Sequence, residues 1–346
     1  MTATGILPVP ADVALTADPV VIPVTSVTST SRRGIRGALR PVARHLAVLA
    51  LLAVSVYFVL PQLATAGATV GTVGRFKWSW LPAIALAGTA TYAMAALSLM
   101  AAAGGGLRFR RTMPAQLAAA FTNRLLPAGV GAMATNVRYM ERAGLSRRRA
   151  ATAVGLDSVA GFLVHAVALL AVSALFHSSH QPFRIGGPDL PDHWSFLVLV
   201  AGLLSVVGVV LEVTRHRWLG PLRGAARPLA DLARHPGRGA RLLAASAGVT
   251  GAFILALYAS VLATGAGVSL LAVSAAYLGG SALAAAAPTP GGLGAVEAGL
   301  IAGLIAVGEP AAAAVTAVLV FRIVTYWAPV LPGAVSFWAL RRAGAL

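Results

Sequence analysis

The sequence predicts an all-α membrane protein: a polytopic bundle of six transmembrane helices with two further helical segments broken by proline and glycine. Hydrophobic residues make up 58% of the 346 residues and charged residues only 11%, whereas soluble proteins carry roughly 25% charged residues. Long apolar runs recur along the chain, and arginines gather between them. We therefore expect the net charge of +17 to set the membrane topology and to contact anionic lipid heads, and we expect no nucleic-acid binding.

The N-terminal region differs from the rest of the chain. Residues 1–31 contain no lysine or arginine and lack the basic start of a signal peptide, so we expect a disordered cytoplasmic tail. The arginine-rich juxtamembrane segment 32–44 follows and places the N-terminus in the cytoplasm. Residues 45–342 then form a single transmembrane domain. The absence of cysteine excludes disulfides and thiolate metal sites.

Six apolar runs are long enough to cross a hydrocarbon core, which takes about 20 residues. They are 45–66, 80–103, 150–176, 194–213, 242–263 and 311–338. If these runs alone cross the membrane, the arginine-rich connections 138–149 and 214–241 fall on the cytoplasmic side together with both termini. Arg75 and Lys77, in the connection after the first run, are the exception.

Two more apolar segments, 114–137 and 269–307, are interrupted near their middle. A full crossing of the first segment would carry the arginines of 138–149 to the outer side. We therefore expect two re-entrant hairpins. The breaking residues are Pro127, Gly129 and Gly131 in the first hairpin, and Pro288, Pro290, Gly292 and Gly294 in the second.

The two breaks share a motif. Pro-x-Gly-[Val/Leu]-Gly begins at Pro127 and again at Pro290, an offset of 163 residues. Three predicted spans separate the hairpins, so the repeats would be inverted across the membrane. Inverted repeats with broken helices that meet at mid-membrane are typical of alternating-access carriers. Because unpaired backbone groups must be buried in protein or line a wet cavity, we expect both breaks to line one central cavity.

The second break, Pro-Thr-Pro-Gly-Gly-Leu-Gly-Ala-Val-Glu at 288–297, and the segment Val-Phe-Arg-Ile-Val-Thr-Tyr-Trp-Ala-Pro at 320–329 resemble the lysylphosphatidylglycerol synthase transmembrane-region family, also called flippase-like integral membrane proteins. The first half agrees at 123–131 and 136–139, and the resemblance covers about residues 45–342. Many members carry an acidic residue just after the first break, where this chain has Gly131-Ala132-Met133. The role of that carboxylate is therefore not carried over.

The resemblance implies movement of a lipid, often a phospholipid with a modified head or a polyprenyl-linked sugar. The aminoacyl-transferase activity of the family's namesakes resides in a separate soluble domain that this sequence does not show, so synthase activity is not implied. The arginine-rich composition suits a bacterium with a GC-rich genome, and we expect the bacterial inner membrane.

Inserting a charged side chain at the middle of a membrane helix costs about 2.5–3.5 kcal/mol, so each charge in a predicted span is expected to have a compensating partner or a function. Glu297 and Arg322 either form a structural ion pair or bind a lipid phosphate. Arg124 either reaches a phosphate in the cavity or extends to the cytoplasmic face. Asp157 either pairs with Arg124 or Arg138 or handles substrate or a proton. The candidate substrate-binding residues are Arg124, Arg138, Asp157, Glu297, Arg322 and Tyr326.

These features predict a lipid flippase or carrier that works without a cofactor. The sequence contains no ATP-binding loop and no catalytic constellation, so we expect no enzyme. His177, His180, Asp189, Asp192 and His193 lack a metal-binding spacing, and we expect no metal. The alternative is a non-transporting scaffold that recruits a cytoplasmic glycosyl- or aminoacyl-transferase through the basic connections. The substrate lipid, the direction of movement and the oligomeric state stay open.

Overall fold

The computed structural model describes residues 74–126, 129–178, 234–285 and 292–346, and within these ranges the secondary structure is helical, with no strand. In chain order the helices are η1 (Trp78–Trp80), α3 (Leu81–Ala103), α4 (Phe109–Leu125), α5 (Val130–Arg142), α6 (Arg147–Ser178), α8 (Pro236–Ala263), α9 (Leu270–Ala285), α10 (Ala295–Ala306), α11 (Ala311–Arg322), η3 (Ile323–Trp327) and α12 (Val330–Arg342).

Four helical stretches in the described part of the chain are long and apolar enough to cross a membrane. They are Trp78–Ala103, Arg147–Leu175, Pro236–Ala263 and Ala311–Arg342. They coincide with four of the predicted spans, 80–103, 150–176, 242–263 and 311–338. The other two predicted spans, 45–66 and 194–213, lie outside the described residues, as do the tail 1–31 and the basic segment 32–44.

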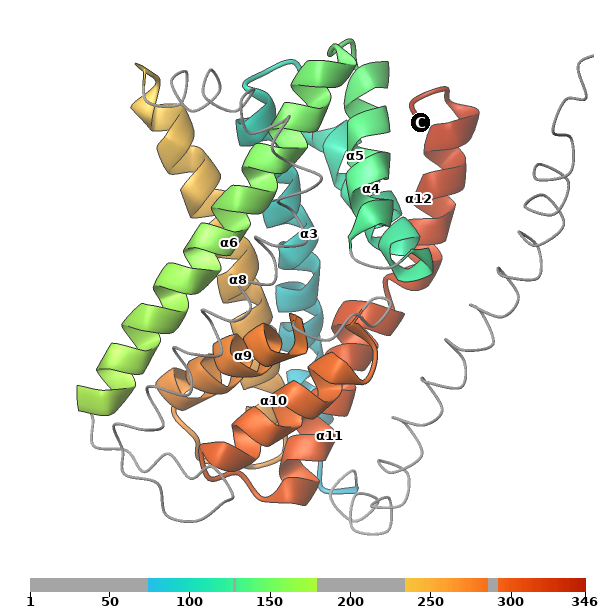
Figure 1. The fold of residues 1–346 in the computed structure, drawn as a ribbon. Helices are drawn as coiled ribbons and strands as arrows, with labels where there is room; N and C mark the ends of the chain where they lie inside the picture. Colours follow the sequence, from blue (N-terminus) through green and yellow to red (C-terminus); the bar gives the residue numbers. More distant parts are fainter. Residues whose placement is uncertain (1–73, 127–128, 179–233, 286–291) are drawn as a thin grey trace, which may run out of the picture. The chain divides into compact units, whose positions relative to one another are not determined.

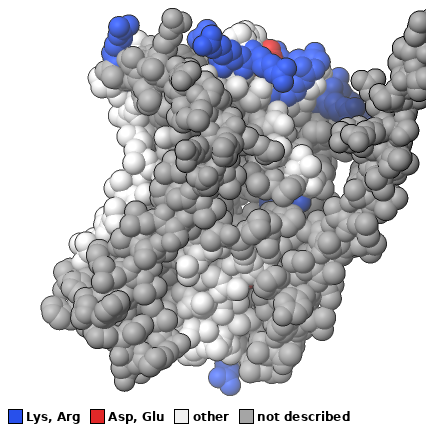
Figure 2. Space-filling view, viewed as in Figure 1, with Lys and Arg blue, Asp and Glu red and all other residues white. Residues whose placement is uncertain are grey.

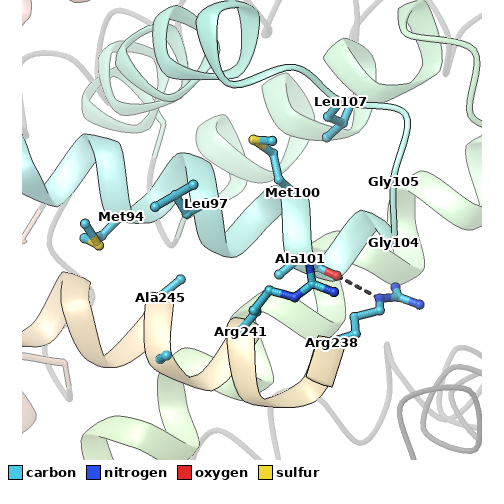
Figure 3. Close-up of a pocket in the computed structure, with 11 residues that line it drawn as sticks. Met94, Leu97, Met100, Ala101, Gly104, Gly105, Leu107, Arg238, Arg241 and Ala245 are labelled. Carbon is cyan, nitrogen blue, oxygen red and sulfur yellow. Dashed lines mark hydrogen bonds between the residues drawn. The ribbon is translucent and has the colours of Figure 1, made fainter. Parts of the chain in front are cut away.

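Helices α3 and α8 pack side by side in opposite directions (Figure 1). At one end of the pair, the Lys77 backbone N–H donates to the Ala263 carbonyl at 2.7 Å. At the other end, the Arg238 guanidinium donates to the Ala101 carbonyl at 2.8 Å (Figure 3). It also donates to the Ala102 carbonyl at 2.6 Å. The last carbonyls of a helix have no partner within it, so Arg238 satisfies groups that the end of α3 leaves free.

Each segment predicted as a hairpin consists of two short helices that pack together, α4 with α5 and α9 with α10 (Figure 1). The second helix of each pair follows a glycine in the left-handed region, Gly129 at φ 75° and Gly292 at φ 71°, which occupy equivalent positions in the repeated motif. The prolines of the breaks, Pro127, Pro288 and Pro290, lie outside the described residues.

Glycines allow the paired helices to approach closely. A Cβ atom on Gly280 of α9 would collide with the Gly299 carbonyl of α10, and one on Gly299 would collide with the Gly280 carbonyl. In the first pair, a Cβ on Gly131 would collide with the backbone of Thr122. Lipid chains are as apolar as leucine, so close packing of small residues is a main source of attraction between membrane helices.

The last span is continuous from α11 through the π-helical segment η3 into α12. Helix α12 packs against α4, where a Cβ on Gly333 would lie 2.7 Å from the Leu117 carbonyl. The rings of Phe121 and Phe337 lie 6.0 Å apart in the same contact. The final element therefore touches the second pair through α11 and the first pair through α12.

Exposed arginines gather at one end of the helices (Figure 2). We call this end the basic face; it comprises the ends of α3, α5 and α12 and the starts of α4, α6 and α8. Its exposed arginines include Arg108, Arg110, Arg111, Arg138, Arg142, Arg147, Arg148, Arg149, Arg241, Arg341 and Arg342.

The glycine contact between α9 and α10 yields a stability prediction. We expect Gly280→Ala to lower the free energy of unfolding by about 1–3 kcal/mol, because the added methyl group must push the two backbones apart. Gly279→Ala is the matched control, since a Cβ at Gly279 meets nothing within 4 Å and the substitution favours the helix. Thermal or SDS-induced unfolding in detergent would compare the two variants. Equal stability of the two variants would contradict the close contact.

Candidate functional site

A buried ion pair joins the second hairpin segment to the last span. The Arg322 Nε of α11 donates to Glu297 Oε1 of α10 at 2.7 Å, and the two residues are only 8% and 7% exposed. Glu297 lies in the first turn of its helix, where a carboxylate also complements the helix dipole. The pair predicted from the sequence therefore forms, and it holds the start of α10 against α11.

Two guanidiniums, one from each half of the chain, lie close to the ring of Tyr326. The Arg322 Cζ lies 4.1 Å from the ring centroid, and the Arg124 Cζ lies 4.6 Å from it. Arg124 comes from the last turn of α4, next to the first break, whereas Arg322 comes from α11. We call Arg124, Glu297, Arg322 and Tyr326 the central cluster. A cation over an aromatic face gains roughly 0.5–2 kcal/mol, most where water is excluded.

The backbone at Tyr326 has an irregular conformation with a clear local cause. The segment Ile323–Trp327 is π-helical, and the Ala328 N–H bonds back to the Ile323 carbonyl at 2.7 Å. Pro329 follows and has no N–H to give to the Thr325 carbonyl. The Tyr92 hydroxyl of α3 donates to that carbonyl instead, at 3.2 Å. Single π-helical turns occur frequently at functional sites.

Several buried polar atoms of this region make no hydrogen bond within the described part of the chain. They are Arg124 Nε and Nη1, Arg322 Nη2, Glu297 Oε2 and Asn123 Oδ1. Arg124 does reach one partner, since its Nη2 donates to the Tyr92 hydroxyl at 3.4 Å. A buried donor without a partner costs about 1–3 kcal/mol, and more when it is charged. The cluster therefore offers unused donors to a ligand.

The charges of the central cluster favour an anion. Two guanidiniums face one carboxylate, and among the described residues that carboxylate bonds only to Arg322. Arg124 forms no ion pair within the described residues. A planar guanidinium with free N–H groups matches a phosphate or carboxylate in geometry as well as in charge.

Two of the predicted site residues lie elsewhere. Arg138 is on the basic face, where its Nη1 lies 3.6 Å from Glu141 Oε2. Asp157 of α6 accepts a hydrogen bond from the Ser98 hydroxyl of α3, and Ser98 in turn lies 3.0 Å from the Ser246 hydroxyl of α8. The expected pairing of Asp157 with Arg124 or Arg138 was wrong, because hydroxyl groups on two neighbouring helices satisfy the carboxyl group.

Sequence reasoning missed Tyr92, which links Arg124 to the π-helical turn. The available signal was a single tyrosine in a span of otherwise small and aliphatic side chains between Leu81 and Ala103. Sequence reasoning also missed Ser98 and Ser246. Serine is common in membrane helices, so nothing in the sequence marked these two.

A metal site does not emerge from the described ranges, where no group of three or more potential ligand residues occurs. Of the histidine and aspartate group considered in the sequence, His180, Asp189, Asp192 and His193 lie outside the described residues.

Comparison with known proteins identifies one family. A family model described as "Lysylphosphatidylglycerol synthase TM region" matches residues 42–333, which include both helix pairs and the whole central cluster. No curated protein matches the chain.

The buried pair yields a second stability prediction. We expect Glu297→Gln to lower the free energy of unfolding by about 3–5 kcal/mol, because it leaves the Arg322 guanidinium buried without its carboxylate. Adding Arg322→Met to that variant should restore part of the loss, since the uncompensated charge is then gone. Unfolding measured on the wild type, both single variants and the double variant would give the coupling energy. Additive effects would show that the pair contributes nothing to stability.

Proposed function

The chain belongs to the lysylphosphatidylglycerol synthase TM region family, and from this premise we propose that it is a lipid carrier rather than an enzyme. Its cargo is a phosphate-bearing lipid, either a modified phospholipid or a polyprenyl-linked sugar, which it moves across a bacterial inner membrane. The observation that carries the proposal is the pair of guanidiniums on Tyr326, which have buried N–H donors without a partner among the described residues.

Each member of the central cluster has a role in this proposal. Glu297 engages Arg322 through Nε and leaves Nη2 free for the lipid phosphate. Arg124 supplies two further free nitrogens from the opposite half of the chain. Tyr326 keeps the two cations near each other in the absence of a ligand, because its ring face attracts both. The phosphate replaces water in the site while the lipid tails stay in the bilayer.

The helix order supports a movement in which two halves alternate. The series α3, α4–α5, α6 is followed by the series α8, α9–α10, α11–α12, each a long helix, a short pair and a second long helix. Adding 164 to the bounds of α6, 147 and 178, gives 311 and 342, the bounds of the last span. We infer that the short pairs are re-entrant hairpins of an inverted repeat and that their breaks face one cavity.

The transport prediction concerns Arg124. In liposomes with a labelled lipid head and an impermeant quencher, we expect Arg124→Gln to slow head-selective movement about 10- to 100-fold, because it removes charged donors to the phosphate. Arg138→Gln is the matched control, because Arg138 lies on the basic face at 3.6 Å from Glu141. The lipid panel comprises anionic phospholipids, aminoacylated phospholipids and polyprenyl phosphates, compared with protein-free liposomes.

A second pair of variants tests the aromatic ring. Tyr326→Phe keeps the ring face and should retain transport, whereas Tyr326→Leu should lose most of it. The carrier proposal fails if no lipid moves faster than in protein-free liposomes. The assignment of the site fails if transport occurs and Arg124→Gln moves the lipid as fast as Arg138→Gln does.

A scaffold is the second candidate function, and the exposed basic face favours it. Such a scaffold would bind a cytoplasmic glycosyl- or aminoacyl-transferase through these arginines. Replacing Arg147, Arg148 and Arg149 with glutamine should then abolish transferase recruitment, measured by co-purification, while unfolding stays unchanged. If the protein is a carrier alone, the same triple variant should transport lipid at close to the wild-type rate and recruit nothing.

A further inference from the structure

A cavity lies away from the central cluster, between the end of α3 and the first turns of α8 (Figure 3). Its volume is about 570 Å³, within the range of roughly 300–1,000 Å³ that is usual for ligand sites. Leu97, on its wall, is 40% exposed, so the cavity opens at the side of the helix pair. The lining residues are Met94, Leu97, Met100, Ala101, Gly104, Gly105, Leu107, Arg238, Arg241, Ala244 and Ala245.

The two ends of this cavity differ in chemistry. Along α3 the wall is formed by Met94, Leu97 and Met100, which are apolar, and methionine adapts easily to the shape of a ligand. At the end of α3, Figure 3 shows the guanidiniums of Arg238 and Arg241 beside the last helical turn. An occupant that satisfies the whole cavity must therefore combine an apolar chain with an anionic group.

The two arginines are held differently. Arg238 is fixed by its bonds to the Ala101 and Ala102 carbonyls. Within the described residues, Arg241 donates only Nε, to the Gly237 carbonyl at 3.0 Å, so its terminal nitrogens are available. None of the described residues lining the cavity is an aspartate or glutamate, so the lining itself supplies no anion. Since no described residue pairs with Arg241, solvent or a ligand can supply its counter-charge.

We propose that this cavity binds an anionic phospholipid, with its phosphate at Arg241 and one acyl chain along Met94, Leu97 and Met100. The site belongs to the membrane leaflet that borders the basic face, because both arginines lie at that end of the helices. Basic pockets between membrane helices near this level are suited to anionic head groups. A free phosphate would leave the apolar wall unused. The inference is independent of the proposed transport function, since it involves no residue of the central cluster.

Photolabelling of the full-length protein tests the proposal. The probe is phosphatidylglycerol with a diazirine in its acyl chain, reconstituted with the protein in phosphatidylcholine vesicles, and mass spectrometry identifies the labelled residues. We expect labelling at 94–107, with at least severalfold less labelling there by a phosphatidylcholine probe of the same chain. Arg241→Gln should reduce the phosphatidylglycerol labelling about fivefold, the effect expected for one cation near an anionic head.

Arg342→Gln is the matched control, because it removes an exposed arginine of the basic face outside the cavity. Its labelling at 94–107 should equal that of the wild type. Met100→Trp fills the apolar end without changing the charge and should also reduce labelling. The proposal is overturned if both probes label 94–107 equally, or if Arg241→Gln and Arg342→Gln behave alike. Competition by soluble glycerol phosphate as effective as that by unlabelled phosphatidylglycerol would also overturn it, in favour of a free-phosphate site.

Discussion

A guanidinium buried among membrane helices needs compensation within a few ångströms, and Arg322 obtains it from the Glu297 carboxylate and the Tyr326 ring. The carboxylate comes from α10 and the ring from the π-helical turn, so this compensation fixes the start of one hairpin segment against the last span. Arg124 then approaches the same ring from α4 without a carboxylate of its own. The structure therefore joins both halves of the chain at one aromatic ring. Two guanidiniums meet there with a single carboxylate, so the junction has a net positive charge.

This junction depends on close backbone packing. Between α9 and α10, the backbones of Gly280 and Gly299 are so close that a Cβ on either residue would collide with the carbonyl of the other. Between α4 and α5, Gly131 lies against the backbone of Thr122. Larger side chains at these positions would separate the two helices of each pair. The end of α4, which bears Arg124, and the start of α10, which bears Glu297, would then move. Glycine at these three positions is thus linked to the position of the charges.

Apolar length and charge in the sequence were enough to predict the four spans that the structure describes and the two broken segments between them. Glu297 and Arg322 were recognisable because a charge in an apolar run demands a partner. The partner of Asp157 was not recognisable, because a serine in an apolar run does not need a charged partner. Its contacts also depend on how three helices are rotated relative to one another. Arg138 was misplaced for a related reason. Helix α5 continues to Arg142, which carries Arg138 away from the break to the basic face.

The distribution of carboxylates explains why the arginines fall into two groups. The described ranges contain four carboxylates, at Glu141, Asp157, Glu297 and Glu309, and only Glu141 and Glu297 pair with arginine there. Arginines on the basic face can be neutralised by water, salt or lipid heads. Among the described residues, Arg124 meets only uncharged partners, in Tyr92 and Tyr326. A cation kept in that position at a cost to stability is more easily explained by an anionic ligand than by packing, and the membrane supplies such anions as lipid phosphates.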